Sequence, residues 1–361
     1  MKREGVIKRL REQLRGKKLP ALLVTSPVNL CYLSGFTGTD SAGVVTEEEL
    51  ILLTDFRFVE QATKECPGWK VVEHPGVARV DWISAFLSEK GIPRLGLEAD
   101  HLTWNQYMRL GEAAPKLLLE PTLGMVEELR IIKQAWEIER IRGALRAGEA
   151  AFEAMRGFIR AGVTEKEVAD ELERQLRHAG AQRSGFETIV AFDANGSLPH
   201  ARPGKQALGK KGAVLVDWGA EVEGYNSDLT RVLCSGRVTT KFEKVYGVVL
   251  GAQKAGIEAV GPGVKAGEVD GAAREVIARA GYGERFGHGL GHGVGLEVHE
   301  GPTVRGKSED VLMPGMVITI EPGIYIPGWG GIRIEDMVLV TKKGREVLSS
   351  VGKELEETLL G

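Results

Sequence analysis

Residues 286–299 read Phe-Gly-His-Gly-Leu-Gly-His-Gly-Val-Gly-Leu-Glu-Val-His, and the stretch continues through Ile-Thr-Ile-Glu-Pro-Gly at 318–323 to Gly-Ile-Arg-Ile-Glu-Asp at 331–336. Glu321 ends an apolar run and Glu335 follows Ile332 and Ile334, so both carboxylates are predicted to lie in buried strands. A buried carboxylate is costly unless it is paired, hydrogen-bonded or bound to a metal. The stretch therefore predicts a cation at the centre of the fold.

A second pair of acids lies in residues 214–231, which read Val-Leu-Val-Asp-Trp-Gly-Ala-Glu-Val-Glu-Gly-Tyr-Asn-Ser-Asp-Leu-Thr-Arg. This pattern predicts a strand, a polar turn and a returning strand. Asp217 lies in the outgoing strand and Asp228 in the returning one, so cross-strand pairing could bring the two acids together. The segment that carries Glu321 and Glu335 has the same plan. We therefore expect two acid-bearing hairpins to converge, with His292 adding a nitrogen ligand.

An internal repeat relates the two hairpins. Residues 162–180 align without gaps with residues 263–281, and both copies begin with Gly-Val and end with Ala-Gly. Each copy reads as a helix that ends at glycine, with another helix before it and strand-like sequence after it. The repeat predicts two related α/β halves with a sheet between them, and the cleft where they meet is a favoured place for a site.

The number of acids indicates how many ions the site holds. Four carboxylates balance the charge of two divalent ions, and bridging acids would hold these about 3.5–4 Å apart. Oxygen-rich ligation favours Mn²⁺, with Co²⁺, Fe²⁺ or Zn²⁺ as alternatives. A nucleotide-binding GxGxxG loop is excluded because its last glycine would fall on Val294 or Leu296. The glycines of this stretch are instead interpreted as allowing substrate and metal to approach the backbone.

The chain length predicts two domains. At 361 residues, with 43% apolar and 27% charged residues, the chain exceeds what one core usually serves. The first third alternates strand-like and helix-like stretches, which is typical of a small α/β domain. A long helix with an apolar stripe follows Gly124. We therefore predict domains at 1–124 and 125–361, both of mixed α/β (α+β) class.

Composition also limits the partners and the cell compartment. No segment has the length and apolar character of a membrane span, and the basic amphipathic start does not resemble a signal peptide. The net charge of −3 gives no basic footprint for nucleic acid. Cys31, Cys66 and Cys234 are odd in number and far apart, which favours reduced thiols. We expect a cytoplasmic protein that binds neither membranes nor nucleic acid.

Five residues resemble, in register, the metal ligands of the pita-bread metallopeptidases, a family that includes methionine aminopeptidase, aminopeptidase P and prolidase: Asp217, Asp228, His292, Glu321 and Glu335. The resemblance extends over nearly the whole chain. The first third resembles the creatinase-type domain of prolidase and aminopeptidase P, which methionine aminopeptidase lacks. Four further positions match the active site of this Xaa-Pro-cleaving branch: His200, His288, His299 and Arg333. The resemblance implies a creatinase-like N-terminal domain and a pseudo-two-fold pita-bread catalytic domain.

The resemblance also implies a reaction and a role for each residue. Water activated between two ions would attack the carbonyl before proline, and Glu321 would accept its proton. His299 and His200 would stabilise the developing oxyanion or bind the substrate carbonyl. His288 would line the pocket for the proline ring. Arg333, two residues before Glu335 on the same strand face, would orient that acid.

One departure from the family leaves the substrate length open. Prolidases place an arginine four residues after the position of His299 to bind the dipeptide carboxylate, whereas this chain has Thr303 there and Arg305 two residues later. If Arg305 reaches inward, an Xaa-Pro dipeptidase is expected. If it is solvated, aminopeptidase P activity on longer Xaa-Pro peptides becomes the better prediction.

Two other functional classes compete with a peptidase. Metal-free, creatinase-like hydrolysis and a non-catalytic binding protein are both disfavoured, because the ligand set is complete. Relatives with this N-terminal domain commonly form homodimers, so a homodimer is expected.

Overall fold

The computed structural model describes residues 3–74 and 79–360, and the chain divides into two compact units, Met1–Arg130 and Ile131–Gly361. The helix predicted at the amino terminus begins at Glu4, and Met1 and Lys2 lie outside the described residues. The domain limits 1–124 and 125–361 remain a prediction. Within the described ranges, no helix combines the length and apolar character needed to cross a membrane.

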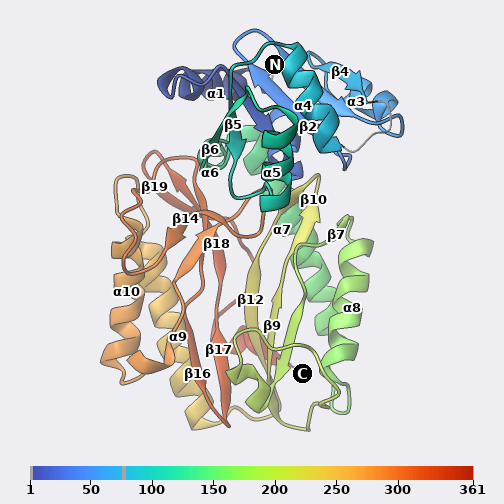
Figure 1. Ribbon diagram of the computed structural model, residues 1–361. Coiled ribbons are helices and arrows are strands. Elements are labelled where there is room, and N and C mark those ends of the chain that lie inside the picture. Colours follow the sequence, from blue (N-terminus) through green and yellow to red (C-terminus); the bar gives the residue numbers. More distant parts are fainter. Residues whose placement is uncertain (1–2, 75–78, 361) are drawn as a thin grey trace. The chain divides into compact units, whose positions relative to one another are not determined.

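The N-terminal unit is built on a six-stranded sheet with the order β4-β3-β2-β1-β5-β6 (Figure 1). β1, β2 and β3 pair antiparallel, whereas β4, β5 and β6 join in parallel. Apolar residues of the sheet pack with α4 and α5 in one core. The helices are α1 Glu4–Gly16, α2 Pro27–Ser34, α3 Val59–Glu65, α4 Arg79–Glu89, α5 Trp104–Ala113 and α6 Glu127–Ile131, and the strands are β1 Ala21–Val24, β2 Ala42–Thr46, β3 Leu50–Thr54, β4 Lys70–Glu73, β5 Arg94–Glu98 and β6 Leu118–Thr122.

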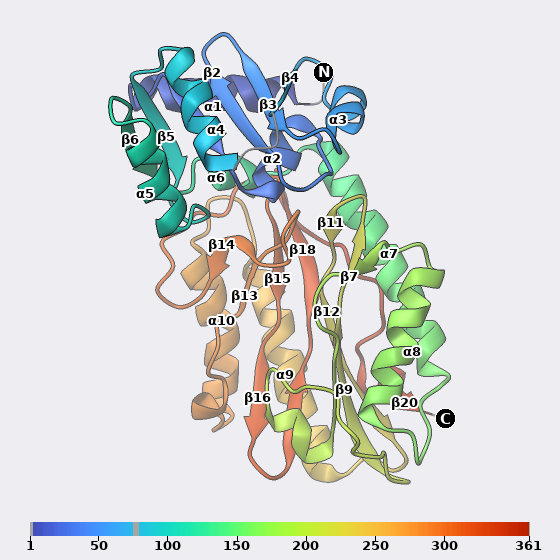
Figure 2. The ribbon, with the colours of Figure 1, turned by 45° about the vertical axis from the view of Figure 1, so that its right-hand side comes forward.

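The C-terminal unit contains two larger sheets, with the orders β20-β12-β9-β8 and β14-β13-β15-β18-β19. In both ribbon views, α7 and α8 lie along one side of these strands and α9 and α10 along the other (Figures 1 and 2). The helices are α7 Ala135–Arg156, α8 Glu165–His178, α9 Thr240–Ala259, α10 Ala266–Arg279 and the 3₁₀ turns Asp193–Ser197, Gly283–Arg285 and Leu355–Thr358. The strands are β7 Arg183–Ser184, β8 Ile189–Phe192, β9 Gly212–Trp218, β10 Ala220–Val222, β11 Tyr225–Asn226, β12 Leu229–Ser235, β13 Gly291–Gly293, β14 Glu300–Val304, β15 Val317–Ile320, β16 Gly323–Ile326, β17 Gly330–Arg333, β18 Asp336–Thr341, β19 Gly344–Val347 and β20 Leu359–Leu360.

The predicted repeat is confirmed in its helices. α8 and α10 each have 14 residues, and each follows a longer helix, α7 or α9. The glycines before and after the two helices share a left-handed backbone, with φ of 92° and 87° at Gly162 and Gly263 and of 95° and 84° at Gly180 and Gly281. Glycine is the residue that adopts this conformation without strain. The same start and stop therefore place both helices against the sheets.

Strand alternation decides which acids face the site. Val214 and Val216 of β9 pack in the core that contains α7 and α8, whereas Leu215 packs in the core that contains α9 and α10. Successive side chains of a strand point to opposite faces. Asp217 therefore shares the face of Leu215.

A break in two strands places the other acids. β15 pairs with β18 up to Ile320 and Asp336, and β16 pairs with β17 from Gly323 and Arg333. Glu321 and Glu335 lie in the gap between these two ladders. Their side chains therefore approach each other from backbone that is not paired in a regular sheet. The Glu335 amide donates to the Thr230 carbonyl in β12 at 3.2 Å, which joins the two halves of the repeat beside the acids.

Candidate metal centre

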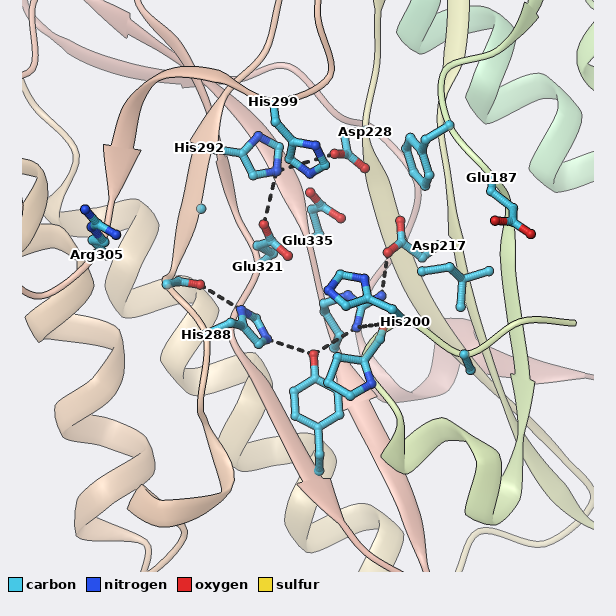
Figure 3. A pocket seen from close by; sticks show the side chains of 18 of the residues that line it. Glu187, His200, Asp217, Asp228, His288, His292, His299, Arg305, Glu321 and Glu335 are labelled. Carbon is cyan, nitrogen blue, oxygen red and sulfur yellow. Dashed lines mark hydrogen bonds and ion pairs between the residues drawn. The ribbon is translucent and has the colours of Figure 1, made fainter. Parts of the chain in front are cut away.

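The five residues predicted as ligands come together in the lining of a cavity of about 620 Å³ in the C-terminal unit (Figure 3). Their ligand atoms form two groups, in each of which all atoms lie within 4.8 Å of one another. The groups are Asp217 with Asp228 and Glu335, and His292 with Glu321 and Glu335. Glu335 belongs to both. Such sharing is what a carboxylate that bridges two ions requires.

Asp217 and Asp228 meet on a diagonal. In the ladder of β9 and β12, Asp217 is paired with Thr230, and Asp228 lies two residues before Thr230. The expected hairpin thus brings the acids together, but with a threonine between them. The Thr230 hydroxyl donates to Glu335 Oε2 at 2.7 Å and accepts from Arg333 Nε at 3.1 Å. This residue was not predicted, although its place two residues after Asp228 puts it on the same face.

The orientation of His292 leaves one nitrogen for a cation. Its Nδ1 donates to the Gly293 carbonyl at 3.1 Å, so Nε2 carries the free lone pair of the neutral ring. Nε2 lies 3.3 Å from Glu321 Oε1 and 3.6 Å from Asp228 Oδ2. Without a metal this nitrogen can be protonated. Burial opposes that charge, but contact with Glu321 raises the pKa of His292.

The remaining electrostatics indicate missing positive charge. Burial raises the pKa of Glu335 and of Asp228 well above the ordinary carboxyl range, and the neighbouring acids raise both further. Burial also raises the pKa of Asp217, although Arg333 counteracts it. Burial alone would raise the pKa of Glu321 too, but His292 lowers it. One guanidinium and one imidazole therefore do not balance four buried acids.

Two carboxylate oxygens test directly whether a metal fits. Among the described residues, Asp217 Oδ1 and Glu335 Oε1 are buried and have no hydrogen-bond partner. Buried polar atoms are almost always satisfied. Both residues belong to the group that they form with Asp228. The donor set of carboxylates and one imidazole therefore fits divalent cations.

Arg333 contacts Asp217, whereas the sequence predicts that it orients Glu335. Its Nη2 forms an ion pair with Asp217 Oδ2, and its Nη1 donates to the Tyr325 hydroxyl at 2.8 Å. It reaches Glu335 only through Thr230. The charge of Arg333 also lowers the pKa of Glu335, although burial raises it more. The role predicted for Arg333 toward Glu335 stays a prediction, and its ion pair with Asp217 in the other half is an additional contact.

His288 lies at the lower wall of the cavity (Figure 3). Its Nδ1 donates to the Gly289 carbonyl at 2.8 Å, and its Nε2 accepts from the Tyr325 hydroxyl, also at 2.8 Å. Burial lowers the pKa of His288 and raises the pKa of Tyr325 to about 12. Tyr325 thus links His288 to Arg333. Sequence analysis missed it, because a tyrosine in an apolar strand gives no signal of its partners.

The other predicted residues line the same cavity. The ring centroids of His299 and His292 are 4.3 Å apart. A His299 nitrogen also lies within 4.8 Å of ligand atoms of Asp228 and His292. His200 lies on the opposite side of the acids, and exposed Arg305 lies at the far left of Figure 3. Thr303 also lines the cavity. Phe186 and Glu187, which were not predicted, also line it, and Glu187 lies on the Asp217 side in Figure 3.

The contacts of Gly291 and Gly293 bear on the interpretation that the glycines of this stretch let substrate and metal approach the backbone. A Cβ on Gly291 would lie 2.0 Å from the Thr319 carbonyl oxygen, and one on Gly293 would lie 2.0 Å from that of Gly301. Real Cβ contacts are never this short. These two glycines therefore allow β13 to pass between its neighbours. Gly289 and Gly291 also line the cavity, so the expected approach of a ligand to the backbone stays a prediction.

Two family models together match most of the chain. The description "Creatinase/Prolidase N-terminal domain" matches residues 7–132, and "Metallopeptidase family M24" matches residues 139–342. An Xaa-Pro dipeptidase of Pyrococcus horikoshii is 36% identical over 351 residues, covering 97% of this chain and 98% of the relative.

Solved structures show the same similarity. An Xaa-Pro dipeptidase from Bacillus anthracis superposes with a TM-score of 0.95 at 41% identity, covering 98% of this chain and 99% of the other. An X-Pro aminopeptidase from Thermotoga maritima superposes with a TM-score of 0.88 at 34% identity, covering 94% and 99%. A dipeptidase and an aminopeptidase, so named, therefore both occur among the similar structures.

Proposed function

The chain belongs to metallopeptidase family M24 and carries a Creatinase/Prolidase N-terminal domain, and from this premise we propose that it is a metal-dependent Xaa-Pro dipeptidase. The supporting observation is the pair of ligand groups that share Glu335 and leave two buried carboxylate oxygens without partners. A proline-containing dipeptide is the proposed substrate, as the names of the dipeptidase relatives suggest.

The proposed cofactor is a pair of divalent ions, Mn²⁺ before Co²⁺, Fe²⁺ or Zn²⁺, because oxygen ligands outnumber nitrogen ligands. Asp217, Asp228 and Glu335 would hold one ion, and His292, Glu321 and Glu335 the other. When bound, the pair would supply Lewis-acid activation of water and of the substrate carbonyl.

Glu321 is the proposed proton acceptor. Its pKa is lowered by His292 despite burial, so the carboxylate is ionised near neutral pH. It faces the cavity, where an attacking water and the substrate can both reach it. The same carboxyl group could then deliver the proton to the leaving proline nitrogen.

His299 and His200 are proposed to stabilise the oxyanion. Burial and the neighbouring His292 lower the pKa of His299, so its ring stays neutral and donates a hydrogen bond without a full charge. His200 faces the same cavity from the opposite side.

His288 and Arg333 are proposed to shape the binding site. The two hydrogen bonds of His288 fix its ring as a wall for the proline. Arg333 is a positioning residue, since it holds Asp217 and, through Thr230, Glu335.

Aminopeptidase P activity is the second candidate, and Thr303 is the observation that favours it. This threonine lines the cavity where the family's carboxylate-binding arginine is expected, and Arg305 is exposed. We propose Arg305 as the replacement grip for the dipeptide carboxylate. If it does not act so, longer Xaa-Pro peptides become the better substrates.

Association and location complete the proposal. A homodimer is supported by the apolar side chains that the N-terminal unit exposes, among them Phe56 at 76% and Trp104 at 74%. A cytoplasmic location is supported by Cys66 and Cys234, which are both free thiols.

The proposed function is tested with purified protein, an Ala-Pro dipeptide and an Ala-Leu control. Release of alanine from Ala-Pro alone, lost on dialysis against chelator and regained with Mn²⁺, is the expected result. Equal hydrolysis of both dipeptides would overturn the specificity, and turnover that survives metal removal would overturn the chemistry.

A further inference from the structure

A second cavity of about 610 Å³ adjoins the central one in the C-terminal unit. It shares three lining residues with the central cavity, namely His288, Gly289 and Arg305, and is open to solvent, with Arg274, Gly287, Gly306 and Lys307 forming the rest of its lining. We call this second cavity the side chamber. Because the two cavities share a wall, a peptide bound at the acids can extend into the side chamber without leaving the protein surface.

The lining of the side chamber is basic. It contains Arg274, Arg305 and Lys307 and no acidic residue. Arg274 is neutralised by buried Asp270, with which it makes two hydrogen bonds of 2.8 Å. It also donates to the carbonyls of Phe286 and His288 at 2.9 Å. Arg274 is therefore a fixed part of the wall, and Arg305 and Lys307 supply the net positive charge.

The two ends of the combined cavity differ in charge, because Glu187 at one end forms an ion pair with Arg202 at 3.9 Å, whereas the side chamber at the other end is lined by no acidic residue. In Figure 3, Arg305 and Glu187 lie on opposite sides of the acids and histidines of the metal centre. A peptide has a positive amino end and a negative carboxyl end. The positive charge of Arg305 and Lys307 therefore favours binding with the carboxyl end toward Arg305 and the side chamber.

We propose that the side chamber binds the residue that follows proline in an Xaa-Pro-Yaa peptide and selects an acidic Yaa through Lys307. This inference rests on the proposed function and names its substrate class beyond the dipeptide. Arg305 stands at the entrance, where a dipeptide carboxylate ends. Lys307 stands further in, where the side chain or terminal carboxylate of a third residue would lie.

Space and charge can be changed separately in the side chamber. A Cβ on Gly287 would meet nothing within 4 Å, and this glycine is not among those with a left-handed backbone. Gly287→Leu therefore narrows the chamber without backbone strain. Lys307→Glu reverses a charge at an exposed position. Lys343→Glu, in the exposed turn between β18 and β19 and outside both linings, makes the same change of net charge as a control.

The experiment measures kcat/KM for Ala-Pro, Ala-Pro-Glu, Ala-Pro-Gln and Ala-Pro-Lys with the metal-loaded full chain. Within each variant, the tripeptide values are divided by the Ala-Pro value. The parent protein should favour Ala-Pro-Glu over Ala-Pro-Lys by about two- to fivefold, as expected for an exposed charge pair. Lys307→Glu should lower or invert this ratio, whereas Lys343→Glu should keep it. Gly287→Leu should lower all three tripeptide values relative to Ala-Pro by at least about fivefold.

The outcomes separate this inference from the proposed function. Hydrolysis of none of the four peptides would contradict the proposed function itself. Hydrolysis of tripeptides with the same charge preference in Lys307→Glu and in the parent would overturn the role of Lys307. Tripeptide turnover that Gly287→Leu leaves unchanged relative to Ala-Pro would overturn the side chamber as the third-residue site.

Discussion

The Thr230 hydroxyl donates a 2.7 Å hydrogen bond to Glu335 Oε2, although the two residues belong to opposite halves of the repeat. The same hydroxyl accepts from Arg333 Nε, which places it between a guanidinium and a proposed ligand. Partners that orient a metal ligand typically contribute ten- to a hundredfold to metal affinity or activity. Thr230 is thus the contact through which the two halves fix one carboxylate.

Thr230→Val tests this contact, because valine has the shape of threonine without the hydroxyl. We expect metal affinity or kcat/KM for Ala-Pro to fall about ten- to a hundredfold. Thr122→Val, which removes a buried hydroxyl bonded to the Leu97 carbonyl in the N-terminal unit, is the matched control. Metal titration and an Ala-Pro assay of both variants compare their metal affinity and kcat/KM. Equal effects would show that loss of a buried hydroxyl, and not its contact with Glu335, caused the change.

Glu335→Gln should have opposite effects with and without metal. Burial raises the pKa of Glu335, so the folded metal-free protein holds a proton that the unfolded chain releases above about pH 4.3. This carboxyl group therefore lowers stability as pH rises from that value. At pH 7, glutamine should raise the melting temperature of metal-free protein but lose most metal binding and activity. Exposed Glu346→Gln is the control, and a gain that persists undiminished at pH 4 would refute the assignment.

Asp228→Asn should release at least one ion per chain and remove nearly all activity. The substitution replaces a charged ligand by a weaker neutral one at a site that balances two divalent cations. Metal content by mass spectrometry and circular dichroism on the same sample separate ligand loss from unfolding. Full turnover with unchanged metal content would contradict the two-ion site.

Tyr325→Phe should reduce kcat/KM about tenfold or more, because it leaves His288 Nε2 and Arg333 Nη1 without a shared partner. Burial raises the pKa of Tyr325 to about 12, so the hydroxyl keeps its proton and donates a hydrogen bond throughout the pH range of the assay. No tyrosine ionisation should therefore be seen in the pH profile. Tyr246→Phe also removes a buried hydroxyl, one that donates to the Lys353 carbonyl, and serves as control. Similar activity losses in the two variants would count against a specific role.

Arg305→Ala tests the carboxylate grip. Loss of a charge-assisted hydrogen bond of roughly 1.5–3 kcal/mol should lower kcat/KM for Ala-Pro by about ten- to a hundredfold. Ala-Pro-Gln should lose much less, since its carboxylate lies one residue further out. Exposed Arg285→Ala, outside both cavities, is the control. Equal losses for both lengths would make Arg305 structural, and no loss would move the preference to aminopeptidase P.

The sequence predicted the fold class well, because its signals are local and repeated. The pita-bread architecture with a creatinase-type N-terminal domain is confirmed by both family matches and by the solved structures. The helices after Gly162 and Gly263 could be read from their glycines alone. The acids were found because carboxylates are rare in apolar strands. Their convergence followed from the repeat.

The contacts between strands could not be read in the same way. The ion pair of Arg333 with Asp217 depends on how β17 lies against β9, so alternation along its own strand pointed to Glu335 and could not reveal Asp217. Tyr325 and Thr230 are ordinary strand residues whose roles arise only from contacts across the site. The need for Gly291 and Gly293 likewise comes from neighbouring strands. Residue types predicted the chemistry, whereas tertiary packing determined the partners.

The most direct test of the account is the number of metal ions per chain, measured with activity on one sample. Metal-free protein is titrated with Mn²⁺, and bound metal and Ala-Pro hydrolysis are recorded at each step. The account predicts saturation at two ions per chain, with full activity reached only as the second binds. Maximal turnover with one ion or none, or saturation at a single ion, would contradict it.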